Sequence, residues 1–194
     1  MLRCAITDRG YAKANAVRWA EAGVDFVQLR DKSLDAGDLA KLARAILEDL
    51  AQISGATPRL LSLLINGRAD VAIAVGAAGV HLTAHPDEIT PEQVRRVFEI
   101  AGKPAPLVSI SCHTTEEVQR AKAASIDLIF FGPVFEKRVD GELVSAGVGL
   151  GVLHEACVAA EDIPVLALGG VTAERIDDCL RAGAKGVAGI RLFS

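Results

Sequence analysis

One short pattern occurs four times in this chain of 194 residues, and it constrains the fold more than any other feature. Each copy has small residues that close a helix, then a tight turn, then an apolar strand. Three copies keep a glycine in the turn, where a helix end commonly requires a left-handed residue. The copies begin 54, 48 and 58 residues apart, at Ala22, Gly76, Ala124 and Ala182. This spacing is about twice the length of one strand-helix unit and predicts a (β/α)8 barrel.

Apolar runs and helical patterns alternate along the chain, as in a parallel sheet that helices cover from outside. We expect strands at residues 3–7, 24–30, 60–65, 79–82, 106–111, 126–131, 164–168 and 186–190. We expect helices at residues 12–22, 34–53, 68–76, 91–101, 114–124, 148–160 and 172–182. Thr114 and Thr172 stand where N-cap hydroxyls are needed, and acidic residues follow both. The chain is therefore predicted to be a single TIM-barrel domain over residues 1–194.

Three stretches depart from this regular alternation. Residues 54–59 are rich in turn-forming residues, and residues 136–147 form a polar segment after the sixth strand. The longer segment is either a lid or binding loop, or an idle surface loop. Only residues 191–194 follow the eighth strand, so we expect an α/β barrel that lacks a complete eighth helix. Either another chain covers that strand, which hints at a homo-oligomer, or the natural chain continues.

Composition restricts the partners and the location. With 51% hydrophobic and 24% charged residues, the chain is globular rather than disordered. Its net charge of −4 disfavours a nucleic-acid partner, because phosphate-backbone binding requires a basic face. It has no membrane-length apolar run and no signal-peptide pattern at its start, so we expect a cytoplasmic protein that does not bind membranes. The four cysteines form no CxxC pair, so reduced thiols are expected instead of disulfides or a zinc site.

In a barrel of this kind, binding and catalytic residues lie at the carboxyl ends of the strands. Gly169, Gly170 and Gly189 end the seventh and eighth strands, where barrels frequently bind phosphate through backbone N–H groups and a helix N-terminus. Arg191 adds a partner for an anion. A Gly-Gly pair can also make a tight strand-to-helix turn, but its position at the seventh strand favours a phosphate site.

A second polar group lies on the second strand. Gln28, Arg30 and Lys32 alternate, so their side chains would share one face and point into the barrel mouth. Three polar groups facing a parallel-strand core are costly without a ligand, which favours binding of a second anion such as a pyrophosphate. The alternative is a salt-bridged cluster with Asp8 or Asp70.

Histidine supplies the candidate acid or base. His113 follows the fifth strand beside a helix start, and a neutral imidazole exchanges protons near neutral pH. His81 lies on the fourth strand and could be a hydrogen-bonded core residue. His85 precedes a proline in a loop and could be surface only.

Six ordered motifs carry a resemblance to a known family. They are residues 26–32, 64–72, 78–82, 111–117, 131–135 and 163–171. Together they resemble the thiamine phosphate synthase and thiazole tautomerase (TenI) family, from about residue 5 to residue 192. The resemblance implies an enzyme that acts on a small phosphorylated substrate.

For the synthase branch, the resemblance implies that a hydroxymethylpyrimidine pyrophosphate joins a thiazole phosphate with Mg²⁺ and loss of pyrophosphate. The implied pyrophosphate and pyrimidine side comprises Gln28, Arg30, Lys32, Asn66, His81 and Ser111. The implied cradle for the thiazole phosphate comprises Gly169, Gly170, Gly189, Ile190 and Arg191.

The departures from the family pattern bear on the choice of reaction. Gly67 stands where the family has an aspartate, and residues 83–86 replace an acidic motif, which leaves Asp87 as a possible metal ligand. Residues 136–140 replace a Thr-x-Thr-Lys pattern, and Arg191 replaces a serine. Because Mg²⁺ requires several oxygen ligands, these losses should weaken a metal-dependent displacement.

We therefore expect a thiamine-biosynthesis enzyme whose activity is a metal-independent, tautomerase-like isomerisation with His113 as acid or base. This activity would require no cofactor. The first alternative is a divergent thiamine phosphate synthase that uses Mg²⁺ held by Asp87 or Asp8. The second alternative is a non-catalytic barrel that binds a phosphate ligand.

Overall fold

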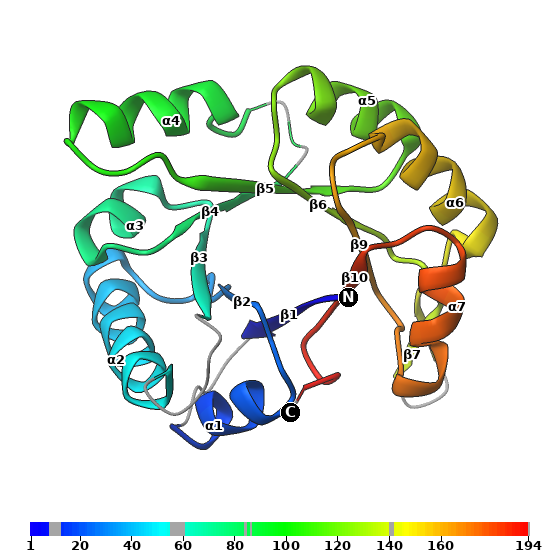
Figure 1. Ribbon diagram of the computed structural model, residues 1–194, viewed down its shortest axis with the longest axis horizontal. Helices are drawn as coiled ribbons and strands as arrows, with labels where there is room; N and C mark the ends of the chain where they lie inside the picture. Colours follow the sequence, from blue (N-terminus) through cyan, green and yellow to red (C-terminus); the bar gives the residue numbers. More distant parts are fainter. Residues whose placement is uncertain (8–12, 55–60, 84, 86, 140–141, 194) are drawn as a thin grey trace.

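Eight parallel strands close into a barrel in the computed structural model, which describes residues 1–7, 13–54, 61–83, 85, 87–139 and 142–193 (Figure 1). The order around the ring is β1, β10, β9, β6, β5, β4, β3 and β2. The barrel strands are β1 (Leu2–Thr7), β2 (Phe26–Leu29), β3 (Ser62–Asn66), β4 (Gly79–Leu82), β5 (Leu107–Cys112), β6 (Leu128–Phe131), β9 (Val165–Leu168) and β10 (Gly186–Gly189). The predicted barrel is confirmed.

The helices lie outside the ring of strands (Figure 1). They are α1 (Lys13–Glu21), α2 (Ala36–Ser54), α3 (Ala69–Val75), α4 (Pro91–Ile100), α5 (Thr115–Ala123), α6 (Gly149–Ala160), the 3₁₀ helix η1 (Ala173–Arg175) and α7 (Ile176–Arg181). None of them, within the ranges described above, is long and apolar enough to cross a membrane.

Two apolar layers stabilise the barrel. The larger layer fills the space between strands and helices, and the smaller one contains Cys4, Ile6, Leu128, Phe130, Leu166 and Ala188. The larger layer includes Ala5 of β1 and Val187 of β10, which are 1% and 0% exposed. Phe193 also belongs to this layer, and no helix follows β10 up to that residue. The side chains of the eighth strand in that layer are therefore already covered, which differs from the bare strand that the sequence suggested.

The fourfold pattern has the turn geometry expected for it. Gly23, Gly76 and Gly183 have φ values of 64°, 72° and 106°. The third copy has Ser125 with φ of 55°, so a residue with a Cβ adopts the same left-handed conformation. The conformation costs a non-glycine residue roughly 1–2 kcal/mol. The shared turn, more than the residue type, is thus the repeated feature.

Two elements differ from the sequence expectations, and one predicted helix cap is confirmed. The expected strand at 24–30 is observed only as Phe26–Leu29, so Arg30 and Lys32 lie beyond it. The expected helix at 172–182 is divided into η1 and α7, and the Thr172 side chain makes no cap hydrogen bond. The cap expected at Thr114 is present, because its hydroxyl accepts the Glu117 N–H at 3.2 Å.

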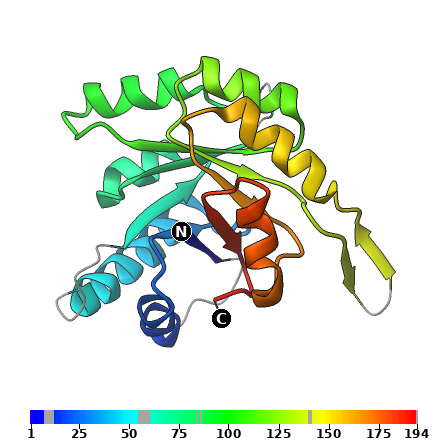
Figure 2. The same cartoon turned by 45° about the vertical axis from the view of Figure 1, so that its right-hand side comes forward.

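The segment at 136–147 is a β-hairpin instead of an irregular loop. Its strands, β7 (Lys137–Val139) and β8 (Glu142–Ser145), pair antiparallel. The hairpin projects away from the barrel (Figure 2). Its base is fixed by hydrogen bonds from Val148 N–H to the Pro133 carbonyl and from Gly149 N–H to the Val134 carbonyl, both 2.9 Å. The turn-rich segment expected at 54–59 lies almost wholly outside the described residues.

Candidate functional site

A cavity of about 850 Å³ opens at the carboxyl ends of β9 and β10. Its lining includes all five residues of the predicted phosphate cradle: Gly169, Gly170, Gly189, Ile190 and Arg191. The parallel strands end at the same edge of the barrel, so residues about twenty positions apart in sequence meet there. The structure therefore brings this group together in one place.

Close packing of two loops explains why glycine occupies this edge. Gly169 has φ of +90°, and a Cβ there would lie 2.6 Å from the Cα and Cβ atoms of Pro133. Gly170 has φ of +64°, and a Cβ there would lie 2.8 Å from the Glu136 carbonyl oxygen and from Phe135 Cβ. A larger residue at either position would push the β6–β7 connection away from the cavity.

Several backbone N–H groups at this edge are available to bind a ligand. The N–H groups of Gly169, Gly170 and Ile190 donate to no acceptor in the described ranges. Two of the carbonyls are used: Phe135 N–H donates to Gly169 O at 3.0 Å, and Arg175 Nη1 donates to Gly170 O at 3.3 Å. Since unpaired N–H groups carry partial positive charge, the edge favours an anion.

The second predicted group is only partly assembled. Gln28 is 2% exposed, and its amide donates to Asn66 Oδ1 at 2.9 Å, which joins β2 to β3 inside the barrel mouth. Arg30 and Lys32 are exposed after the end of β2. The prediction that all three residues share one strand face is wrong, because the strand ends at Leu29.

The alternative salt-bridged cluster is not formed with Asp70. That carboxylate pairs with Arg68, whose Nη2 lies 2.6 Å away, and the hydrogen bond from Arg68 lowers the pKa of Asp70. Asp8 lies outside the described residues. The cations at 30 and 32 therefore remain candidates for contact with a ligand.

A buried polar chain runs from β4 to β5. His81 is 2% exposed, and its ring lies 4.6 Å from that of Phe130, measured between centroids. Its Nδ1 lies 2.9 Å from Ser109 Oγ, and its Nε2 lies 2.8 Å from Ser111 Oγ. Burial, with a smaller effect of the charge on Arg30, lowers the pKa of His81 to about 3. The ring is therefore neutral and positions Ser111 at the barrel mouth.

His113 lies at the end of β5 and is exposed. Its Nδ1 donates to the carbonyl of Gly132, and its backbone N–H donates to Glu117. With Nδ1 as the donor, a neutral ring has its lone pair on Nε2. His113 does not line the cavity at β9 and β10, and β6 lies between those strands and β5.

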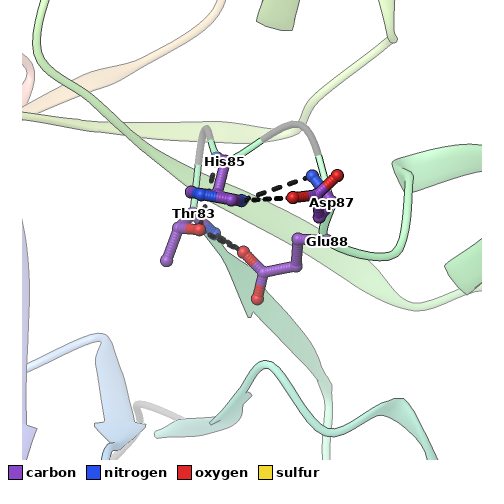
Figure 3. A network of polar contacts seen from close by, with 4 residues as sticks. All are labelled: Thr83, His85, Asp87 and Glu88. Atoms are coloured by element: carbon purple, nitrogen blue, oxygen red, sulfur yellow. Dashed lines mark hydrogen bonds and ion pairs between the residues drawn. The ribbon is translucent and has the colours of Figure 1, made fainter.

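Magnesium, which the family resemblance implies, requires several oxygen ligands. Figure 3 shows two acidic side chains, Asp87 and Glu88, on the loop after β4, where the sequence places the candidate ligand Asp87. The Thr83 N–H donates to Glu88 Oε2 at 2.6 Å, and Glu88 Oε1 lies 3.1 Å from where a Cβ at Gly67 would be. Asp87 lies 3.8 Å from the His85 ring, and its side chain is 89% exposed.

These groups do not make a metal site by themselves. No cluster of three or more His, Cys, Asp or Glu side chains suited to a metal ion occurs in the part of the chain that the structure describes. Asp8, the other expected ligand, lies outside that part. The described side chains therefore do not by themselves supply a full set of Mg²⁺ ligands.

Sequence reasoning missed several residues of this region. Ser109 could have been found, because it lies two positions before Ser111 and so faces the same side of β5. Arg175 and Phe135 line or support the cavity from outside the strand ends. Glu88 approaches Gly67 only through the path of the loop after β4. No spacing rule for strands predicts those three positions.

Comparisons with known proteins agree with the fold and the motifs. The family model described as thiamine monophosphate synthase matches residues 4–193. A relative from Aquifex aeolicus, named as a putative thiamine-phosphate synthase 2, is 37% identical over 194 residues. The match covers 97% of this chain and 95% of that protein. The thiamine-phosphate synthase of Methanoculleus marisnigri is 37% identical over 181 residues, which cover 93% of this chain and 79% of that protein.

A solved structure shows the same similarity in three dimensions. The thiamine phosphate pyrophosphorylase from Pyrococcus furiosus superimposes with a TM-score of 0.78 and 25% identity. The superposition covers 97% of this chain and 85% of that one.

Proposed function

The chain belongs to the thiamine monophosphate synthase family, and we propose that it is a thiamine-phosphate synthase that joins a hydroxymethylpyrimidine pyrophosphate to a thiazole phosphate. Pyrophosphate leaves the pyrimidine, and the thiazole takes its place. The observation that supports this proposal most is the cavity at β9 and β10, which is lined by Arg191 and by residues whose N–H groups have no acceptor within the described ranges. The names of the relatives support the same reaction.

We assign the thiazole phosphate to this cavity. The N–H groups of Gly169, Gly170 and Ile190 donate to its phosphate oxygens, and Arg191 supplies a charge-assisted contact. Gly189 has no side chain, so it leaves the approach open. This arrangement positions the thiazole ring toward the centre of the barrel mouth.

We assign the pyrimidine pyrophosphate to the β2–β3 side. Gln28 and Asn66 already bond each other and hold their remaining amide groups in fixed positions for the pyrimidine. Arg30 and Lys32 neutralise the pyrophosphate as it leaves. His81 holds Ser111 in place for a polar contact with the same substrate. Mg²⁺, where bound, would add positive charge to the leaving group, and no protein step depends on it here.

We now prefer the synthase activity over the tautomerase activity that the sequence led us to expect. The relatives reported above bear synthase or pyrophosphorylase names, and none of the geometry places His113 in the phosphate cavity. The Nδ1 atom of His113 is engaged by the Gly132 carbonyl, which fixes the direction of the ring. We propose a supporting role for it, in orienting the pyrimidine side, in place of the acid-base role.

The partners and the location are part of the same proposal. The cradle fits a small phosphorylated substrate, and the net charge of −4 favours neither nucleic acid nor an anionic membrane surface. We propose that the protein acts in the cytoplasm, where its four free thiols would stay reduced. We also propose that the protein forms a homo-oligomer.

The proposal is tested by mixing both substrates with the purified protein at saturating Mg²⁺. We expect thiamine phosphate and pyrophosphate to form in equal amounts, and no product when either substrate is omitted. Absence of product, with thiazole phosphate still binding in calorimetry, would contradict the synthase and favour the non-catalytic barrel. Isomerisation of a thiazole carboxylate phosphate without metal would instead favour the tautomerase.

A pair of glycine variants tests the cradle. Gly170→Ala places a Cβ against Glu136 and Phe135. The control is Gly102→Ala, because Gly102 has the same φ of +64° and a Cβ there would have no atom within 4 Å. Gly102→Ala should lose roughly 1–2 kcal/mol of stability from backbone strain, and Gly170→Ala should lose more, because its Cβ also clashes with the β6–β7 connection. Only Gly170→Ala should raise the KM for thiazole phosphate, by about tenfold or more. Equal KM values for the two variants would exclude this edge as the phosphate site.

A further inference from the structure

We propose that Arg175 is an additional substrate-binding residue, whose guanidinium selects the phosphorylated thiazole over the unphosphorylated one. The inference rests on the proposed function, because it places the thiazole phosphate in the cavity at β9 and β10. Arg175 is the last residue of η1 and lines that cavity together with Gly169, Gly170 and Arg191.

Two contacts hold the Arg175 side chain in position before any ligand binds. Its Cζ lies 4.5 Å from the centroid of the Phe135 ring, in a cation–π arrangement. Its Nη1 donates to the carbonyl of Gly170 at 3.3 Å. A guanidinium has five N–H donors, so the bond to Gly170 leaves donors for a ligand. The contacts reduce the loss of side-chain freedom on binding, which favours affinity.

The charges around the cavity make this residue decisive. Four ionisable side chains line it, namely Glu136, Glu174, Arg175 and Arg191. The Thr172 hydroxyl bonds the Glu174 carboxylate and lowers its pKa, so this carboxylate is ionised at neutral pH. The two cations therefore only balance the two anions. Without Arg175 the lining would be net negative and would repel a phosphate that carries almost two negative charges.

The helices after β9, η1 and α7, are short, so their dipoles add little positive charge to the site. A long helix that began at residue 172 would add the positive end of its dipole to the site. The observed segment is a three-residue η1 followed by a six-residue α7. Arg175 supplies, from the end of η1, the positive charge that the expected helix would have contributed.

Calorimetric titration of three variants tests the proposal. Arg175→Gln removes the charge, Arg175→Lys keeps the charge without the planar fork, and Arg181→Gln is the matched control. Arg181 is exposed on α7, pairs with Asp178 and does not line the cavity. Each protein is titrated with thiazole phosphate and with the corresponding unphosphorylated thiazole alcohol.

We expect Arg175→Gln to weaken thiazole phosphate binding about 10- to 100-fold and to leave the alcohol unaffected. Arg175→Lys should fall between wild type and Arg175→Gln, and Arg181→Gln should match wild type. Equal affinity of wild type and Arg175→Gln for thiazole phosphate would overturn the proposal. An equal loss of affinity for the phosphate and the alcohol would also overturn it, because that would indicate a general packing role.

The outcome is separable from that of the proposed function. If wild type makes no thiamine phosphate but binds thiazole phosphate in an Arg175-dependent way, the synthase fails and the role of Arg175 stands. If wild type makes thiamine phosphate and Arg175→Gln has an unchanged KM for thiazole phosphate, the synthase stands and the role of Arg175 fails.

Discussion

His81 is a strongly perturbed ionisable side chain at the barrel mouth, and its environment explains why. The ring lies among apolar atoms, so protonation would place a charge where water cannot solvate it. Ser109 and Ser111 bond both ring nitrogens of the neutral form. A neutral histidine can donate from one nitrogen and accept at the other, so one serine accepts a hydrogen bond and the other donates one.

Stability should therefore fall in acid because of His81. The pKa of the folded state is about 3 and that of an unperturbed histidine is 6.5, so the unfolded chain binds more protons between these values. Lowering the pH from 7.5 to 5 should cost about 2 kcal/mol of unfolding free energy at this residue. Urea unfolding at pH 7.5 and at pH 5 measures this change in the free energy of unfolding.

The variant His81→Gln is the control for this prediction. It lacks the titrating ring and keeps the other three histidines, so its stability should be lower at pH 7.5 but should fall less between pH 7.5 and 5. An identical pH dependence in both proteins would show that another group is responsible.

Residue-level prediction from the sequence succeeded where alternation along a strand applied. Gln28 and Asn66 point inward on β2 and β3, and their hydrogen bond confirms that they are neighbours. Arg30 and Lys32 were wrongly placed on the strand because alternation was continued past Leu29. Arg175 could not be found, because its position depends on a ring of Phe135 that lies forty residues earlier.

At the scale of elements, the helix starts show how capping sets stability. Thr114 has extended backbone angles and accepts the Glu117 N–H, so it satisfies one N–H that α5 would otherwise leave unpaired. Thr172 also has extended angles but makes no such bond. The two threonines looked alike in sequence and differ because the Thr172 hydroxyl bonds the Glu174 carboxylate and no N–H of η1.

Replacing each threonine by alanine should therefore have different effects. Thr114→Ala should lower the unfolding free energy by about 1 kcal/mol, because the cap is lost. Thr172→Ala should change it by less than about 0.5 kcal/mol, because no helix N–H loses a partner. Chemical denaturation of both variants at pH 7.5 checks the difference, and equal losses would contradict the assigned caps.

The elements themselves were predictable to different degrees. Periodicity located the barrel strands and most helices to within about two residues, because burial on one or both faces leaves a clear pattern. The β7–β8 hairpin was read as a loop because the Leu143 and Val144 side chains on β8 are exposed and the two strands form a separate two-stranded sheet. A strand pair without a buried face leaves no alternation to read.

At the scale of the whole molecule, the barrel was predictable because one turn geometry recurs at similar intervals of 54, 48 and 58 residues. A closed ring then places β10 next to β1 and β1 next to β2, so residues near 28 and near 190 belong to one rim. This consequence of closure brings the two proposed anion sites to the same mouth. The position of the Glu88 carboxylate was not predictable in the same way, because Glu88 approaches Gly67 from the loop after β4 and not from a strand.

Two separate anion sites on one rim predict additive stabilisation by two ligands. Thiazole phosphate is assigned to the β9–β10 cavity, and inorganic pyrophosphate serves as a probe of the β2–β3 side. A ligand at 100 times its Kd stabilises the folded protein by about 2.7 kcal/mol, which corresponds to a Tm increase of roughly 5–10 °C. Because the sites share no residue, the two increases should add.

Two single variants assign each increase to its site, because each removes contacts from one side only. At the same ligand concentration, Gly170→Ala should reduce the increase with thiazole phosphate to about half or less and keep that with pyrophosphate, and Arg30→Gln should do the reverse. Arg30 is exposed, so its replacement should leave the fold intact. Thermal unfolding with each ligand alone and with both measures this. If saturating thiazole phosphate instead eliminates the pyrophosphate effect in wild type, both ligands compete for one site and the two-site assignment fails.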